Sequence, residues 1–173
     1  MLIAVTGTPG TGKSSACEIL ARRGYVVVDL DAVARKEGLV VGRDEARGSD
    51  EIDVDALRDG LLVPAKVAVL KAHYSHLMDV NIAIVLRCRP AVLEKRLEAR
   101  RWPREKIREN VEAEAMDLIT QEAANRIPFV YEVDTTDRTP AQTVETILEI
   151  LKGKTEGHEA GSVDWSQEAT GWS

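Results

Sequence analysis

Eight residues near the start of the chain have the types and the spacing of a phosphate-binding loop. The run Gly7-Thr-Pro-Gly-Thr-Gly-Lys-Ser14 matches the pattern G-x-x-x-x-G-K-[ST] at every fixed position. Glycines let such a backbone curl until its N–H groups point at one anion. A lysine can follow the transferring phosphate as a point charge, and a serine hydroxyl can ligate Mg²⁺. The run therefore predicts a site for ATP and Mg²⁺, with these ligands: Gly10, Gly12, Lys13, Ser14 (also the metal ligand) and Ser15.

The residues on both sides of this loop supply the context that the motif needs. Leu2-Ile-Ala-Val5 is a short apolar run, typical of a buried parallel strand. From Lys13 to Arg23 apolar residues recur at helical spacing, and Gly24 ends that helix. A helix that begins at the loop directs its positive end at bound phosphate. The alternative, a glycine-rich turn that matches the pattern by chance, does not require this order of elements.

The remaining chain alternates between expected strands and expected helices. Such alternation indicates a parallel, doubly wound α/β sheet. Together with the phosphate loop, it predicts the P-loop NTPase fold, with a five-stranded parallel sheet flanked by helices. Residues 38–53 are rich in glycine and charge and have little periodicity, which predicts an excursion away from the core. Expected strands span 2–5, 25–28, 66–70, 81–86 and 129–133, and expected helices span 13–23, 32–37, 54–62, 90–99, 104–124 and 139–152.

The composition is that of one folded domain followed by a short tail. Of the 173 residues 44% are apolar and 30% are charged, which excludes wholesale disorder and a disulfide-stapled miniprotein. No apolar run is long enough to span a membrane. Cys17 and Cys88 lack metal-ligand spacing and predict buried free thiols in a reducing cytoplasm. Residues 153–173 are polar and acidic, and predict a loosely ordered tail whose apolar anchors are Val163, Trp165 and Trp172.

Charge is distributed unevenly along the chain. The net charge of −6 argues against stable nucleic-acid binding. Between Arg87 and Arg108, however, nine basic residues stand against three acidic ones. A local basic patch on an acidic protein suits a compact polyanion such as a nucleoside triphosphate. The alternative is a solvated helix face.

Further stretches resemble one family of nucleoside monophosphate kinases. They are Leu30-Asp-Ala-Val-Ala-Arg-Lys36, Ala72-His-Tyr-Ser-His76, Leu97-Glu-Ala-Arg100, Glu109-Asn-Val-Glu-Ala-Glu114 and Glu132-Val-Asp-Thr-Thr136. Together with the phosphate loop, they are similar to the archaeal relatives of adenylate kinase isoenzyme six. The resemblance covers about residues 1–152, as a nucleoside monophosphate kinase domain, and Val163-Asp-Trp165 in the tail.

The resemblance implies roles for two arginines and two segments. Arg35 matches the residue that binds the phosphate of the monophosphate substrate, within an insertion of about residues 29–52. Arg100 matches the arginine of a short lid, about residues 99–109, that closes on ATP. A planar and permanently charged guanidinium suits both tasks. The alternative for each is an arginine on a solvated surface. Thr135 and Thr136 follow the last expected strand, where these folds approach the adenine.

The segment after the third expected strand departs from the pattern of the family that the chain resembles. In that pattern an acidic residue stands two positions before a histidine. The resemblance implies that His73 assists hydrolysis of ATP, with a weaker case for His76. Lys71 occupies the acidic position, and a lysine cannot accept from magnesium-bound water. We therefore expect Asp31, or its neighbour Asp29, to support the metal. Capping of the next helix by the aspartates and a structural role for the histidines are the alternatives.

These features favour a broad-specificity nucleoside monophosphate kinase that reversibly converts ATP and AMP into two ADP. Phosphoryl transfer needs positioning and charge neutralisation rather than a nucleophilic side chain. The resemblance also implies ATPase activity and binding of a small-subunit ribosomal platform protein during ribosome maturation. Two alternatives remain. One is an ATP-driven assembly factor with little kinase turnover. The other is a shikimate-type kinase, which Asp29-Leu-Asp31 suggests but the absence of a Gly-Gly-Gly run after the third expected strand disfavours.

Overall fold

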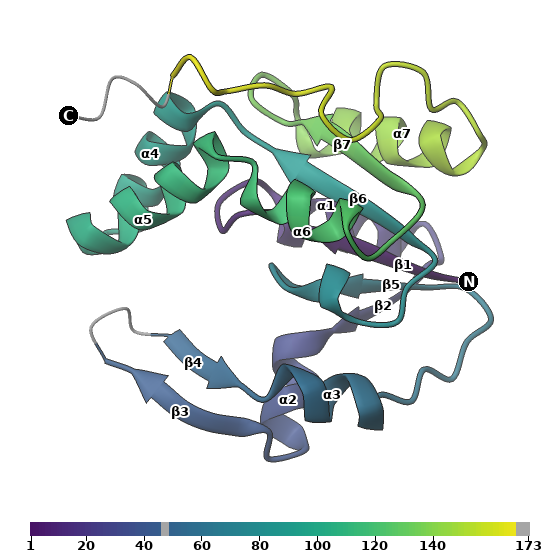
Figure 1. The fold of residues 1–173 in the computed structure, drawn as a ribbon. Helices are drawn as coiled ribbons and strands as arrows, with labels where there is room; N and C mark the ends of the chain where they lie inside the picture. Colours follow the sequence, from purple (N-terminus) through teal and green to yellow (C-terminus); the bar gives the residue numbers. More distant parts are fainter. Residues whose placement is uncertain (46–48, 169–173) are drawn as a thin grey trace.

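The computed structural model describes residues 1–45 and 49–168. Within this part of the chain, five parallel strands form one sheet in the order β2-β5-β1-β6-β7 (Figure 1). The predicted α/β fold with a five-stranded parallel sheet is confirmed. The strands are β1 (Leu2–Thr6), β2 (Val26–Asp29), β5 (Ala68–Lys71), β6 (Ile82–Arg87) and β7 (Val130–Asp134).

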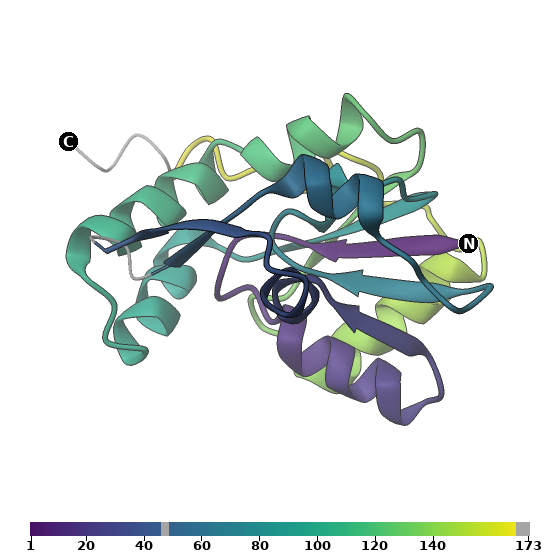
Figure 2. The same ribbon diagram turned by 90° about the horizontal axis from the view of Figure 1, so that it is seen from below.

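Helices cover both faces of this sheet. Successive side chains of a strand point to opposite faces, and the apolar side chains on each face are buried by the helices packed there. In β1, Ile3 and Val5 join the core beneath α1 (Lys13–Arg22) and α7 (Pro140–Leu151), whereas Ala4 packs toward α6 (Leu118–Ala124). Figure 2 shows α1 and α7 together on one side of the sheet and α6 on the other. The predicted start of α7 is confirmed by a capping box, in which Thr139 and Gln142 bond each other's backbone N–H groups.

The segment between β2 and β5 differs from the prediction. Helices α2 (Leu30–Lys36) and α3 (Val54–Gly60) pack their buried leucines against β5. Between them, β3 (Val40–Asp44) and β4 (Ser49–Ile52) form an antiparallel hairpin, where we expected irregular chain. The strands escaped prediction because the hairpin stands apart from the main sheet and buries none of its residues, so its sequence lacks apolar alternation (Figure 1).

Two helices form a hairpin of their own after β6. Helix α4 (Pro90–Ala99) has the predicted bounds and packs Leu93 and Leu97 against α5 (Arg104–Ala115). The turn between them places Arg101 in the left-handed region, with φ of 57°. The prediction of one helix over 104–124 is wrong, because the chain turns at Asp117, with φ of 54°, before α6 begins. The Asp117 carboxylate there accepts a hydrogen bond from the buried Arg87.

The tail is better fixed than the sequence suggests. His158 accepts a hydrogen bond from Glu132 N at 2.7 Å, and a bridge joins Tyr131 to Glu159. Farther along, the Arg89 guanidinium lies 5.8 Å from the ring centroid of Trp165. Residues 153–168 therefore make defined contacts with β7 and Arg89, which the prediction of a loosely ordered tail did not include. Trp172 lies outside the described residues. The backbone and side chains of β7 hold this segment, and a polar composition does not reveal such contacts.

Three smaller features complete the fold. A short 3-10 helix, η1 (Ser75–Leu77), follows β5. Cys17 and Cys88 are buried free thiols, as predicted. In the described part of the chain, no helix is both long enough and apolar enough to cross a membrane.

Candidate functional site

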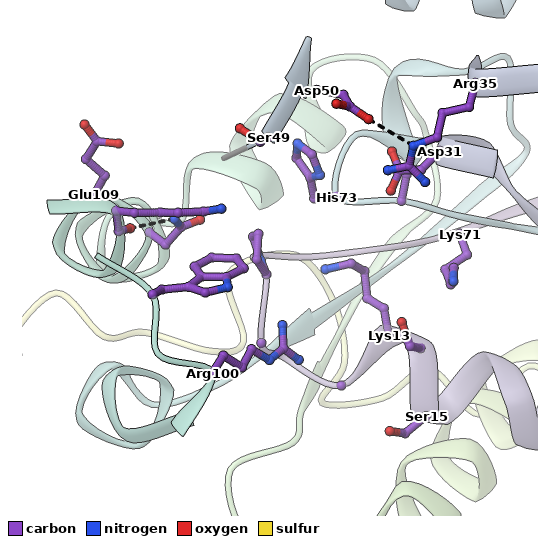
Figure 3. Close-up of a pocket in the computed structure, with 18 of the residues that line it drawn as sticks. Lys13, Ser15, Asp31, Arg35, Ser49, Asp50, Lys71, His73, Arg100 and Glu109 are labelled. Carbon is purple, nitrogen blue, oxygen red and sulfur yellow. Dashed lines mark hydrogen bonds and ion pairs between the residues drawn. The ribbon is translucent and has the colours of Figure 1, made fainter. Parts of the chain in front are cut away.

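A cavity of about 780 Å³ opens at the carboxyl ends of the strands, within the size range of small-molecule sites. Its walls come from the phosphate loop, α2, the β3–β4 hairpin, the segment after β5 and the α4–α5 hairpin. Figure 3 shows Lys13, Asp31, His73 and Arg100 facing the same space from different elements. The predicted residues that line the cavity are Gly10, Gly12, Lys13, Ser14, Ser15, Asp31, Arg35, His73 and Arg100.

The phosphate loop owes its shape to glycines. Gly10 has a φ of 94°, a backbone conformation that L side chains rarely adopt. A Cβ at Gly10 would also lie 2.8 Å from Leu93 Cδ1, so this residue lets the loop contact α4 closely. Gly12, with φ of 102°, precedes the first residue of α1 and turns the chain into the helix. The loop N–H groups therefore lead directly into a helix N-terminus that attracts anions.

Lys13 lies over the loop from which it projects. Its Nζ donates hydrogen bonds to Gly7 O at 2.5 Å and Thr8 O at 3.1 Å. Burial, with a contribution from the positive charge of Arg100, lowers the pKa of Lys13 to about 7. An ammonium at this place would gain from a nearby polyanion, because such a ligand would replace the water that burial removes.

Cations surround the cavity on both sides of the loop. On the α2 side, Arg35 Nε donates to Asp50 Oδ2 at 2.9 Å, as the dashed line in Figure 3 shows. On the α4–α5 side, Arg100 and Lys106 both lie near the ring of Trp102, at 5.9 and 3.7 Å from its centroid. The lining includes six cationic side chains, Lys13, Arg35, Arg43, Lys71, Arg100 and Lys106, and three carboxylates, Asp31, Asp50 and Glu109. Such a cavity favours an anion.

The two aspartates after β2 have different surroundings. Asp29 caps α2, accepting from Ala32 N at 3.1 Å, and pairs with Lys71 Nζ at 2.6 Å. These two residues are register partners on neighbouring strands, which explains their pairing. Asp31 lines the cavity, where Tyr74 donates a hydrogen bond to its Oδ1 at 2.8 Å. Of the two candidates for metal support, only Asp31 lines the cavity, and Asp29 has the capping role that was its alternative.

The two histidines also separate. His73 lines the cavity, and burial, helped by the charge of Lys13, lowers its pKa to about 4. It is therefore a neutral imidazole at pH 7, with one ring nitrogen that can accept a hydrogen bond. His76 is buried away from the cavity lining, with Nδ1 at 2.9 Å from Thr6 Oγ1 and Nε2 at 3.0 Å from Glu122 Oε2. These contacts favour the structural role that was the alternative for His76.

Three further residues considered in the sequence analysis, Arg87, Thr135 and Thr136, do not line the cavity. Arg87 counted toward the basic patch, but it is buried and bonded to Glu114, Glu132 and Asp117. Thr135 and Thr136 are buried and absent from the lining. Thr135 Oγ1 instead braces the phosphate loop by donating to Thr11 O at 2.8 Å.

Sequence reasoning assigned no role to several residues of the wall: Arg43, Ser49, Asp50, Trp102, Lys106 and Asn110. Each belongs to the hairpin or to the turn and helix after α4. The family resemblance marked their segments, since Asn110 lies in the stretch Glu109–Glu114 and the others lie within about residues 29–52 or 99–109. It gave no role to the individual side chains, which reach the cavity through the packing of the fold.

The oxygen donors of the cavity suit Mg²⁺ held jointly with phosphates. In residues 1–45 and 49–168, no group of three His, Cys, Asp or Glu side chains could hold a metal ion by itself. Mg²⁺ in phosphate-transferring sites needs only one or two protein oxygens, because phosphates and waters supply the rest. The Ser14 hydroxyl and the Asp31 carboxylate both line the cavity and fit that requirement.

Comparison with known proteins gives consistent relatives over nearly the whole chain. A protein-family model described as an AAA domain matches residues 3–117. A protein of Archaeoglobus fulgidus named "Putative adenylate kinase" is 43% identical over 171 residues, which cover 97% of this chain and 93% of that protein. Two further relatives have the same name. The protein from Pyrococcus abyssi is 42% identical, over 96% of this chain and 92% of that protein. The protein from Natronomonas pharaonis is 40% identical, over 96% of this chain and 99% of that protein.

Two solved structures share the fold at low sequence identity. A Thermus thermophilus protein superposes with a TM-score of 0.60 and 20% identity, covering 91% of this chain and 98% of that one. Shikimate kinase from Bacteroides thetaiotaomicron superposes with a TM-score of 0.55 and 19% identity, covering 88% and 98%. At this identity, the likeness establishes a P-loop kinase fold for the chain and nothing about its substrate.

Proposed function

Because this chain belongs to the family of archaeal proteins named "Putative adenylate kinase", and is a P-loop kinase, we propose that it reversibly transfers the γ-phosphoryl group of ATP to AMP. The observation that carries the proposal is a single cavity with the phosphate loop between two groups of cations. One group projects from α2 and the β3–β4 hairpin, and the other from the α4–α5 hairpin. A cavity of this form can hold one phosphate group on each side of the loop.

In this proposal, each side of the cavity has its own nucleotide. The loop N–H groups and Lys13 bind the triphosphate, and Arg100 closes over it from the turn at residues 100–103, as part of a lid of about residues 99–109. Arg35 lies in a monophosphate-binding region of about residues 29–52. When AMP binds, the Arg35 guanidinium leaves Asp50 and binds the phosphate of AMP instead. Ser14 and Asp31 would hold Mg²⁺, which supplies neutralisation of phosphate charge. These groups orient two phosphates in line and exclude water between them.

A product assay tests the reaction directly. Purified protein with ATP and Mg²⁺ is expected to form two ADP for each AMP consumed, and to accept other nucleoside monophosphates. Shikimate is the control acceptor for the alternative that the Asp29-Leu-Asp31 spacing raised. Phosphorylation of shikimate, or no ADP from any monophosphate, would contradict the proposal.

Two arginine variants test the division of the cavity. Arg35→Ala is expected to raise KM for AMP by about tenfold or more while changing KM for ATP little, because one charge-assisted contact is lost on one side only. Arg100→Ala is expected to show the reverse pattern. Steady-state kinetics with each nucleotide varied in turn measures both constants. Equal changes in both constants for either variant would contradict separate binding regions.

The aspartates provide a matched pair for magnesium. Asp31→Asn is expected to raise the Mg²⁺ concentration for half-maximal activity by about 10- to 100-fold, because an acceptor for the ion or its waters is lost. Asp29→Asn is expected to leave that concentration unchanged, because the Asp29 carboxylate is already bonded to Lys71 and Ala32 N. Magnesium titrations of the two variants compare these outcomes, and the reverse ranking would remove Asp31 from the metal site.

The lowered pKa of Lys13 predicts proton uptake when ATP binds. At pH 7 about half of the amine is neutral, since its pKa is about 7, and the triphosphate favours the ammonium form. Affinity for ATP is therefore expected to fall as the pH rises from 7 to 9. Because one proton is involved, the affinity can fall by at most about tenfold for each pH unit. Calorimetry in two buffers of different ionisation enthalpy measures the uptake. Lys13→Arg, which stays charged, should remove the effect, and its persistence there would assign the proton to another group.

We further propose that the protein hydrolyses ATP when no monophosphate is bound, with a small-subunit ribosomal protein as partner. A neutral His73 in the cavity wall supports hydrolysis, because its imidazole can accept a hydrogen bond from a water molecule and orient that water toward the γ-phosphate. The net charge of −6 suits a basic partner, and the two free thiols support a cytoplasmic location. Phosphate release without an acceptor, lost in His73→Gln and stimulated by a basic ribosomal protein, is the expected result. Release unaffected by the variant would contradict the role of His73.

A further inference from the structure

A buried carboxylate connects the phosphate loop to the helix that lines the opposite wall. Glu114 stands near the end of α5 and is only 3% exposed. Its Oε2 accepts a hydrogen bond from Thr8 Oγ1, in the phosphate loop, at 2.6 Å. Its Oε1 accepts from Arg87 Nε at 2.8 Å and from Cys88 N at 3.0 Å, at the end of β6. Both oxygens are therefore occupied, and each links α5 to a different element.

Thr8 occupies the centre of the loop's own hydrogen bonds. Its carbonyl accepts from Thr11 N at 3.2 Å, from Thr11 Oγ1 at 2.8 Å and from Lys13 Nζ at 3.1 Å. A shift of Thr8 would consequently move the groups that face the phosphates. The Thr8 side chain does not line the cavity, so its hydroxyl acts on the loop from behind.

The same helix that holds Glu114 also faces the cavity. Lys106, Glu109 and Asn110 line the wall from the earlier turns of α5. Glu114 follows Asn110 by four residues, about one helical turn, which places it on the same side of α5 and deeper in the fold. Helix α5 is thus bonded at its inner end to the loop that it faces across the cavity.

We propose that Glu114 is a positioning residue, which holds Thr8 and with it the phosphate loop in register with α5. This inference deepens the proposed function, since it rests on binding of ATP by the loop. The bond sets the conformation of the loop before the nucleotide arrives, so the loop N–H groups need little rearrangement when ATP binds. Glu114 itself touches no substrate in this proposal.

Two threonines of one network provide a matched test. Thr8 Oγ1 donates to Glu114, and Thr120 Oγ1 donates to Glu132 Oε1 at 2.7 Å. Both hydroxyls are buried, and Glu114 and Glu132 both bind Arg87. Thr8→Val and Thr120→Val each replace one hydroxyl by a methyl group of similar size, and leave Arg87 and its carboxylates in place. Both are expected to lower the melting temperature, because each leaves a buried carboxylate oxygen short of one donor.

Affinity for ATP separates positioning from general stability. Calorimetry with Mg²⁺ and a non-hydrolysable ATP analogue, without AMP, is expected to show Kd raised on the order of tenfold in Thr8→Val and within about twofold of the parent in Thr120→Val. Thr8→Ser, which keeps the donor, should restore most of the affinity. Equal Kd values in the two valine variants would overturn the proposal. It would also be overturned if Thr8→Ser bound the nucleotide no more tightly than Thr8→Val.

The same measurements distinguish this inference from the proposed kinase reaction. If the parent protein binds ATP but forms no ADP from AMP, the proposed kinase reaction is refuted. The comparison of Thr8→Val with Thr120→Val would still decide whether Glu114 positions the phosphate loop. A parent that does not bind ATP would overturn both. If Thr8→Val fails to fold, Thr8→Ser against the parent still tests the bond, because it alters only the methyl group. A tenfold loss in Thr8→Ser would then overturn the role of the hydroxyl.

Discussion

Lys13→Ala is expected to lower kinase turnover by on the order of 10²-fold or more while leaving the fold intact. Lys13 is the cation that reaches over the loop, and its Nζ bonds only loop carbonyls among the contacts described for it. Removing a preorganised charge at the transferring phosphoryl group raises the barrier because nothing in the low-dielectric site replaces it. Single-turnover formation of ADP at saturating ATP and AMP measures the chemical step.

Lys95→Ala is the matched control for this variant. Lys95 is an exposed lysine on α4 outside the cavity lining, so its loss removes the same charge from the protein without touching the site. Its turnover should equal that of the parent, and circular dichroism should show both variants folded. Near-normal turnover of Lys13→Ala would remove the loop from the reaction.

Arg87→Met is expected to reduce the free energy of unfolding by about 3–5 kcal/mol. Arg87 is 1% exposed and bonds three carboxylates, Glu114 of α5, Glu132 of β7 and Asp117 in the turn before α6. Burial opposes its charge, but the three carboxylates outweigh burial and raise the pKa of Arg87. Methionine has a similar shape and no charge, so the variant leaves carboxylates in the interior without a cation. Urea denaturation of the variant and the parent measures the difference.

The size of this effect depends on burial, and a surface pair provides the comparison. Arg23 bonds Glu145, but its side chain is 40% exposed. Arg23→Met is therefore expected to cost less than about 1 kcal/mol, since water and side-chain entropy offset most of an exposed ion pair. Similar losses in the two variants would show that the buried carboxylates rearrange to reach water.

The elements with local signals were predictable from the sequence. The phosphate loop, the apolar β1 and α4 needed only a few adjacent residues, because glycines, an apolar run and Pro90 each act on the backbone beside them. The wall that contains Arg35, His73 and Arg100 was reached through a family resemblance, and the structure places these residues in one cavity.

The rest depends on contacts between residues far apart in sequence. The break before α6 occurs where Asp117 turns to meet Arg87, thirty positions earlier, and no helical pattern encodes that pairing. Arg87 itself looked like part of a basic surface until β6 placed it among carboxylates. The pairing of Asp29 with Lys71 follows from the neighbouring positions of β2 and β5 in the sheet, which the order of strands along the chain does not reveal.

The attachment of the tail to β7 affects how the sheet ends. In the order of strands, β7 lies at one edge of the sheet, and an open edge offers its N–H and C=O groups to any other extended chain. Here Glu132 N donates to His158 O, and the Glu132 carboxylate accepts from Gly161 N at 2.9 Å and Val163 N at 3.0 Å. The protein thus occupies part of this edge with its own chain. Where these bonds form, the edge of β7 has fewer free backbone groups to offer to an extended segment of another copy.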